Sequence, residues 1–198
     1  MARRKQTGRS QAGRLRIVAG LWRSRLLDIA DAEGLRPTSE RIRETLFNWL
    51  APTIHGARCL DLFAGTGALG LEALSRGARE AVFVEQSPVA ARQLETNIGI
   101  VGAQAAANVV QGDGLRYLGS APAGSFNIVF LDPPFAADLL DETCRLLAEN
   151  RLLAAGGLVY LEMERTQDAP SLPDGWQVLK NKTAGNVRYM LVQTGGNE

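Results

Sequence analysis

The fold of this chain is decided by a stretch in its first third, Asp61-Leu62-Phe63-Ala64-Gly65-Thr66-Gly67-Ala68-Leu69-Gly70. A short apolar segment, residues 58–63, leads into it, and apolar residues at helical spacing follow as far as Gly77. The glycines fit the pattern G-x-G-x-x-G, in which a strand turns tightly into a helix and the backbone can pass close to a nucleotide. This spacing predicts a strand, a glycine turn and a helix, but does not by itself identify the ligand.

Downstream of the glycine turn, apolar strands and amphipathic helices alternate. The expected strands are 81–84, 108–111, 126–131 and 157–161, and the expected helices are 88–100, 115–118 and 137–153. Two last segments, 176–180 and 187–193, have the pattern of an antiparallel pair. Apolar strands that alternate with helices are typical of a parallel sheet covered on both faces. The sequence therefore predicts a doubly wound α/β fold that ends in an antiparallel hairpin.

The chain is expected to have three parts: a flexible basic arm over residues 1–13, an N-terminal extension over 14–52 and a main domain over 53–198. The arm lacks any hydrophobic periodicity. Apolar clusters in the extension predict two short strands, followed by a helix that Thr38 or Ser39 can cap and that Pro52 closes.

Basic residues are concentrated at the N-terminus. The first 25 residues hold eight arginines and lysines and no acid, whereas the remaining residues hold 14 basic and 21 acidic groups. A basic segment on an acidic body favours a polyanionic partner. A solvated tail is the alternative.

Composition narrows the class of protein. The 198 residues suffice for one core, and no apolar run approaches the roughly 20 residues that would cross a membrane. Cys59 and Cys144 lie among apolar neighbours and are expected to be buried thiols in a reducing cytoplasm, although a disulfide stays open. His55 is the single histidine and is interpreted as a loop residue, so we expect no structural zinc.

Acidic residues follow three successive predicted strands: Asp61, Glu85 and Asp113. The carboxyl ends of parallel strands meet at one edge, where open α/β sheets bind ligands. Asp61 could hold an ammonium group, Glu85 two ribose hydroxyls and Asp113 an adenine amine. These acids favour a cationic nucleoside that carries an amino acid over a pyrophosphate. The predicted cofactor site also includes Phe63, Ala64, Gly65, Thr66, Gly67, Gln86 and Gly114.

The motif Asp132-Pro133-Pro134-Phe135 ends the fourth strand of the predicted sheet. An amine conjugated to a nucleic-acid base is a poor nucleophile, and acceptors for its two hydrogens can orient it. Asp132 supplies one acceptor and the Pro133 carbonyl a second, while consecutive prolines stiffen the loop. Phe135 offers a face on which a flipped-out base can stack. We interpret these four residues as the catalytic motif.

From Arg16 to Gln193 the chain resembles the RsmD family, bacterial methyltransferases that modify a guanine N2 of small-subunit ribosomal RNA. Besides the motifs above, the resemblance includes the segments Arg16–Arg23, Leu35–Thr38 and Arg41–Asn48. It implies a Rossmann-like class I methyltransferase fold with a seven-stranded, mostly parallel sheet, S-adenosylmethionine as cofactor, and ribosomal RNA or an assembling small subunit as partner. The family often has a glycine where this chain has Ala19, which should affect only the local turn.

By the same resemblance, Arg36 and Thr38 before the first helix are candidate substrate contacts, and the basic residues Arg41 and Arg43 on that helix are further candidates. Three alternatives remain. A DNA or RNA adenine-N6 methyltransferase shares the catalytic motif, but commonly carries a separate recognition domain. A nicotinamide-dependent oxidoreductase shares the glycine pattern but has no use for Asp132. A non-catalytic RNA-binding module would need neither Asp132 nor Asp61.

Overall fold

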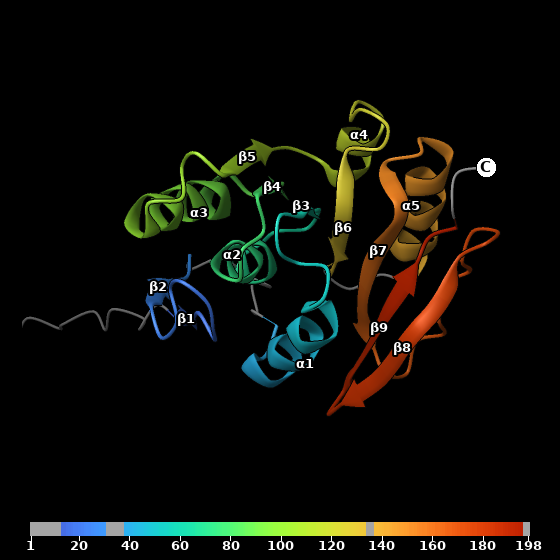
Figure 1. The fold of residues 1–198 in the computed structure, drawn as a ribbon, viewed down its shortest axis with the longest axis horizontal. Helices are drawn as coiled ribbons and strands as arrows, with labels where there is room; N and C mark the ends of the chain where they lie inside the picture. The colour runs from blue at the N-terminus through green and yellow to red at the C-terminus, as the bar shows by residue number, and fades with distance from the viewer. Residues whose placement is uncertain (1–12, 31–37, 134–136, 196–198) are drawn as a thin grey trace, which may run out of the picture.

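The computed structural model describes residues 13–30, 38–133 and 137–195, and within them the chain forms the predicted doubly wound fold (Figure 1). The strands are β1 Arg14–Arg16, β2 Leu26–Asp28, β3 Arg58–Asp61, β4 Glu80–Glu85, β5 Ala107–Gln111, β6 Phe126–Leu131, β7 Leu153–Glu164, β8 Gln177–Ala184 and β9 Val187–Gln193. The helices are α1 Glu40–Leu50, α2 Ala68–Ser75, α3 Pro88–Val101, α4 Gly114–Leu118 and α5 Ala137–Glu149.

The main sheet of the described chain has seven strands in the order β5-β4-β3-β6-β7-β9-β8. Strands β3 to β7 pair in parallel, and β9 and β8 add antiparallel strands at one side. The strand order reverses between β3 and β6, because the chain first builds outward through β4 and β5 and then returns. Ligands of open α/β sheets bind at such a reversal, beyond the carboxyl ends of the strands.

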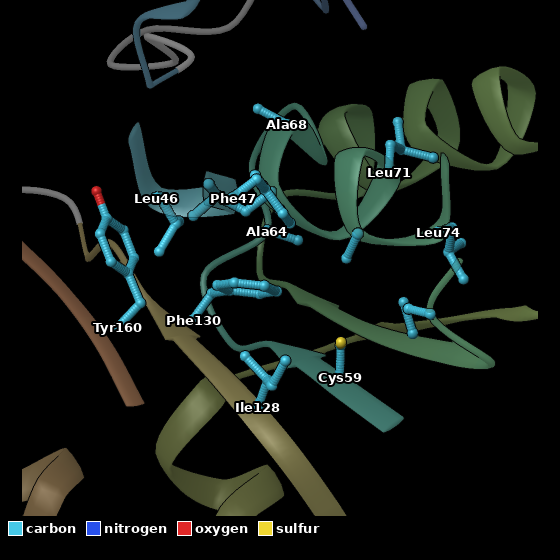
Figure 2. Packing of buried hydrophobic residues seen from close by; sticks show 14 of the residues in the cluster. Leu46, Phe47, Cys59, Ala64, Ala68, Leu71, Leu74, Ile128, Phe130 and Tyr160 are labelled. Atoms are coloured by element: carbon cyan, nitrogen blue, oxygen red, sulfur yellow. The ribbon is translucent and has the colours of Figure 1, made fainter. Parts of the chain in front are cut away.

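Two hydrophobic clusters cover the two faces of this sheet. Helices α1, α2 and α3 pack on one face and α4 and α5 on the other. Figure 2 shows the first cluster, where Phe47 of α1 packs against Phe130 of β6. Cys59 belongs to the first cluster and Cys144 to the second, and both are buried free thiols, as predicted.

Strand β7 is longer than predicted. The pattern indicated residues 157–161, but the strand runs from Leu153 to Glu164. Leu153 pairs with Phe126, and a register shift follows before Leu158 pairs with Ile128. The residues between, Ala154 to Gly157, are alanines and glycines, and only Gly157 is buried, so they give no apolar signal from which a strand could be predicted.

The N-terminal extension shares the first hydrophobic cluster. Leu15 and Leu27 are buried in it, and helix α1 begins after Ser39, whose hydroxyl accepts a hydrogen bond from the Ile42 N–H. The carboxylate of Glu72 on α2 ties the extension down, because it accepts hydrogen bonds from the N–H groups of Val18 (2.8 Å) and Ala19 (2.9 Å). The turn between β1 and β2 is thus held on α2 by polar contacts, while Leu15 and Leu27 of the two strands are buried in the shared cluster.

A glycine is required in the turn that follows. Gly20 has a φ of 84°, and a Cβ there would lie 1.9 Å from the Ser75 carbonyl oxygen. Ala19, the departure from the family pattern, fits its position: its N–H donates to Glu72 and its carbonyl accepts from the Ser75 hydroxyl at 2.6 Å. The substitution therefore leaves the turn intact.

In the described part of the chain, no helix has the length and apolar character needed to span a bilayer. Within the same residues, no three histidine, cysteine or acidic side chains gather into a group that could hold a metal ion.

Candidate active site

Asp61 ends β3 at the strand reversal and is buried. Its Oδ2 accepts a hydrogen bond from the Gly70 N–H at 2.9 Å, which fixes the carboxylate at the start of α2. Burial raises the pKa of Asp61 to about 7; the Gly70 N–H lowers this pKa, and the negative charges of Asp132 and Glu85 raise it. Glu85 and Asp132 therefore lie close enough to Asp61 for their charges to influence its pKa.

Glu85 ends β4 beside the glycine turn and is half-buried. Its two carboxylate oxygens accept hydrogen bonds from the backbone N–H groups of Gly65 and Ser87, both at 2.7 Å. An ionised carboxylate has about four lone-pair positions, so each oxygen can accept a further hydrogen bond from a ligand. Glu85 is thus held rigidly while keeping acceptor capacity.

Backbone conformation and close packing explain why the turn between β3 and α2 contains glycines. Gly65 and Gly67 have φ values of 51° and 75°. A Cβ at Gly67 would lie 2.4 Å from Cδ1 of Leu94. The second glycine therefore lets α2 approach α3, which is a packing requirement that adds to any contact with a ligand.

Asp113 follows β5 and caps α4, with its Oδ1 accepting from the Arg116 N–H at 2.9 Å. The side chain is exposed, which leaves its other oxygen open to solvent or to a ligand. Gly114 packs closely, since a Cβ there would lie 3.2 Å from Leu62 and Phe63.

The other predicted cofactor contacts differ in exposure: Ala64 is buried, Phe63 and Thr66 are half-buried, and Gln86 is exposed.

Asp132 follows β6 and lies at the same edge of the sheet as Asp61. Its Oδ2 accepts a hydrogen bond from the Thr38 hydroxyl at 3.0 Å. Burial raises the pKa of Asp132, and the Thr38 hydroxyl lowers it. Thr38 was predicted from the family resemblance as a substrate contact, and the structure brings it directly to the predicted catalytic acid. Pro133 is half-buried beside it.

Arg43 was predicted as a substrate contact, and that prediction is wrong. The side chain is 1% exposed, so it cannot reach an RNA. Its guanidinium forms an ion pair with Glu72 at 3.1 Å and donates to the carbonyl oxygens of Thr38 (3.1 Å) and Arg16 (2.8 Å). Arg43 instead holds Thr38 in place, whereas Arg41 on the same helix is exposed, as a substrate contact would have to be.

Two buried residues at this edge of the sheet escaped prediction. Glu162 of β7 is 9% exposed, and its Oε2 accepts a hydrogen bond from the Tyr160 hydroxyl at 2.7 Å.

The predicted residues Arg36, Pro134 and Phe135, together with the basic arm as far as residue 12, lie outside the described residues.

The residues at the strand ends fit a cationic nucleoside with an amino-acid group. Three carboxylates from the adjacent strands β3, β4 and β5 line this edge. Asp61 is the buried one, a suitable partner for an ammonium group, and Glu85 keeps free lone pairs for hydroxyls. Asp132 lies on the other side of the strand reversal, so it is not needed to bind the ammonium group or the hydroxyls of such a nucleoside.

Comparisons with known proteins agree with this geometry. The model of the family described as Conserved hypothetical protein 95 matches residues 15–193. The Escherichia coli K12 protein named ribosomal RNA small subunit methyltransferase D is 47% identical over 190 residues, which cover 96% of this chain and 94% of that protein. The chain belongs to this family. A Haemophilus influenzae protein of the same name is 45% identical and covers 91% of this chain and 94% of its own length.

Solved structures of other proteins share the fold of this chain. The Escherichia coli protein yhhF superposes with a TM-score of 0.86 at 44% identity, covering 93% of this chain and all of that one. An RNA methyltransferase from Salinibacter ruber, solved with S-adenosyl-L-homocysteine, has a TM-score of 0.63 at 16% identity, covers 82% of this chain and 96% of its own, and shares the fold. The predicted methyltransferase fold is confirmed, and membership in this family favours it over the dehydrogenase alternative.

Proposed function

We propose that this protein transfers a methyl group from S-adenosylmethionine to the exocyclic N2 amine of a guanine in small-subunit ribosomal RNA. The observation that carries the proposal is the pair of acids Asp61 and Asp132, which end neighbouring strands on the two sides of the strand reversal. One acid suits the cofactor and the other the acceptor. The names of relatives 45–47% identical over nearly the whole chain support the ribosomal substrate.

On this proposal, Asp61 holds the cofactor's ammonium group, Glu85 its ribose hydroxyls and Asp113 its adenine amine. S-adenosylmethionine supplies a methyl carbon on a sulfonium, so the carbon–sulfur bond breaks as the carbon–nitrogen bond forms and one amine proton is released. Asp132 and the Pro133 carbonyl accept the two amine hydrogens and orient the nitrogen, which is the main protein contribution when the electrophile is already reactive. Asp132 or water then takes the proton, and the raised pKa of Asp132 suits that role.

The same proposal places the basic arm, residues 1–13, on RNA phosphates, where lysine and arginine position a nucleic acid without reading its sequence. The extension 14–52 then frames the active-site mouth, and the catalytic machinery lies in 53–198. Exposed Arg41 and residue Arg36 are the proposed substrate contacts beside Thr38. An assembling small subunit in the bacterial cytoplasm is the proposed substrate particle.

Transfer of labelled methyl groups tests this function. Small subunits from a strain that lacks this gene are incubated with the protein and labelled S-adenosylmethionine, and the RNA is digested to nucleosides. We expect label in N2-methylguanosine. Label confined to N6-methyladenosine would contradict the guanine assignment, and absence of label in any nucleoside would contradict methyl transfer to this RNA.

The affinity for S-adenosylmethionine is expected to fall below neutral pH. Burial raises the pKa of Asp61 to about 7, and a cationic ammonium binds the ionised carboxylate. As the pH falls below that value, Asp61 must release a proton on binding, so the Kd should rise, approaching about tenfold per pH unit. Calorimetry between pH 5.5 and 8 measures this slope. Asp61→Asn should flatten it, and an equally flat slope in the unmodified protein would rule out this role for Asp61.

Removing the Glu85 carboxylate is expected to weaken S-adenosylmethionine binding by about 1–3 kcal/mol, the range for hydrogen bonds to a charged group. Calorimetry on Glu85→Ala measures the loss. Glu80→Ala is the matched control, because Glu80 begins the same strand, β4, at the edge far from the site. Equal affinities for the two variants would remove Glu85 from the cofactor site.

A further inference from the structure

A second carboxyl group lies directly beside Asp132. Leu131 of β6 pairs with Leu161 of β7 in parallel register, so the next residues, Asp132 and Glu162, are neighbours across the two strands. Adjacent strands are about 4.7–4.9 Å apart, and side chains in register point to the same face. Asp132 and Glu162 therefore lie side by side at the same edge of the sheet.

Tyr160 fixes the position of Glu162. Its ring packs in the first hydrophobic cluster, 6.5 Å from the ring of Phe130, and its hydroxyl points away from the packed side chains (Figure 2). That hydroxyl donates to Oε2 of Glu162 at 2.7 Å. The hydrogen bond fixes the orientation of the Glu162 carboxylate before any ligand binds, whereas a solvated acid at a strand end would keep several orientations.

The Thr38 hydroxyl lies beside the acids and donates to Oδ2 of Asp132 at 3.0 Å. Burial and the charge of Asp132 raise the pKa of Glu162, and the hydroxyls of Tyr160 and Thr38 lower it. Among the ion pairs of residues 13–30, 38–133 and 137–195, none includes Glu162. A buried acid without a cationic partner destabilises a fold, so its presence beside the catalytic acid indicates a functional use.

Guanine has a chemical feature that such an acid can recognise. Its N1–H is a donor next to the N2 amine, so that edge presents donors to both carboxylates. Adenine has an acceptor at N1. Resting on the function proposed above, we propose that Glu162 distinguishes guanine from other purines: its carboxylate accepts the N1–H while Asp132 accepts a hydrogen of the N2 amine. A hydrogen bond from N1–H also favours the ionised form of Glu162.

The base 2-aminopurine provides the test, because it keeps the N2 amine but has an acceptor at N1. Small-subunit ribosomal RNA is assembled by ligation with guanine or 2-aminopurine at the position found by nucleoside mapping, and kcat/KM is measured for both RNAs. The unmodified protein should prefer guanine by roughly 10- to 100-fold, the discrimination that one good base contact provides. In Glu162→Gln the preference should shrink by about 10-fold or more, because the amide N–H can donate to the acceptor N1.

The ratio of the two rates is internal to each variant, so a loss of folded protein does not alter it. Tyr160→Phe is the control: it removes the hydroxyl that positions Glu162 but keeps the carboxylate, so activity should fall while the preference for guanine persists. An unchanged ratio in Glu162→Gln would overturn the role of Glu162 and leave the methyltransferase proposal standing. Failure of the unmodified protein to methylate the guanine RNA would instead contradict the proposed function itself.

Discussion

Asp132→Ala should lower turnover by at least ~10²-fold, the scale lost with one pre-organised group that acts in a transition state. The side chain is half-buried, and its described hydrogen-bond partner is the Thr38 hydroxyl at 3.0 Å. Removing it should leave the hydrophobic clusters unchanged, because Asp132 belongs to neither. Methyl transfer to ribosomal RNA measures the loss, and circular dichroism checks that the variant folds.

Two comparisons make this result specific. S-adenosylmethionine affinity, measured by calorimetry, should be nearly the same in Asp132→Ala as in the unmodified protein, because Asp132 is assigned to the acceptor. Glu164→Ala, at the exposed end of β7, should keep full activity. If Asp132→Ala transferred methyl groups at a near-normal rate, the assignment of the catalytic acid would be wrong.

Glu72→Gln should lower the free energy of unfolding by about 3–5 kcal/mol, the cost of leaving a buried charge without its partner. The Glu72 carboxylate is fully buried and contacts two guanidinium groups, Arg43 at 3.1 Å and Arg76 at 2.8 Å. It also accepts from the backbone N–H groups of Val18 and Ala19. The glutamine amide carries no charge, so the two guanidinium groups lose their anionic partner. Its NH2 group is a hydrogen-bond donor, and the guanidinium and backbone N–H groups around it are donors too.

The matched control is Glu80→Gln, which breaks the ion pair with Arg58. That pair is more than one-third exposed on both sides, so its loss should cost only about 0–1 kcal/mol. Urea denaturation gives both values. Similar midpoints for the two variants would mean that the buried network contributes no more than a surface pair. Because Arg43 also holds the Thr38 carbonyl, Glu72→Gln should reduce activity in the fraction that stays folded.

Local patterns predicted the strands and helices because burial imposes a period on the sequence. They also predicted that Asp61, Glu85 and Asp113 lie at one edge of the sheet, since parallel strands bring their carboxyl ends together. Arg43 was misassigned because arginine is usually exposed, yet it precedes Leu46 by three residues and Phe47 by four, which places it on the buried side of α1. Its partner Glu72 lies 29 residues away, which no local pattern reveals.

Glu162 had a usable signal. It directly follows the apolar segment 158–161, just as Asp132 follows 126–131, so the argument from acids at strand ends applied to it equally. What the sequence could not supply was the register that sets Glu162 beside Asp132, or the hydroxyls of Thr38 and Tyr160 that hold the two acids. Those contacts join segments up to 94 residues apart, and only the folded chain brings them together.

The anchoring of the N-terminal turn on α2 has a consequence for biosynthesis. The N–H groups of Val18, Ala19 and Trp22 find their acceptors on Glu72 and Ser75, which are 53 or 54 residues later in the chain. A chain is synthesised from its N-terminal side, so this turn emerges from the ribosome before the acceptors on α2 do. The turn can therefore complete these hydrogen bonds only after α2 has emerged.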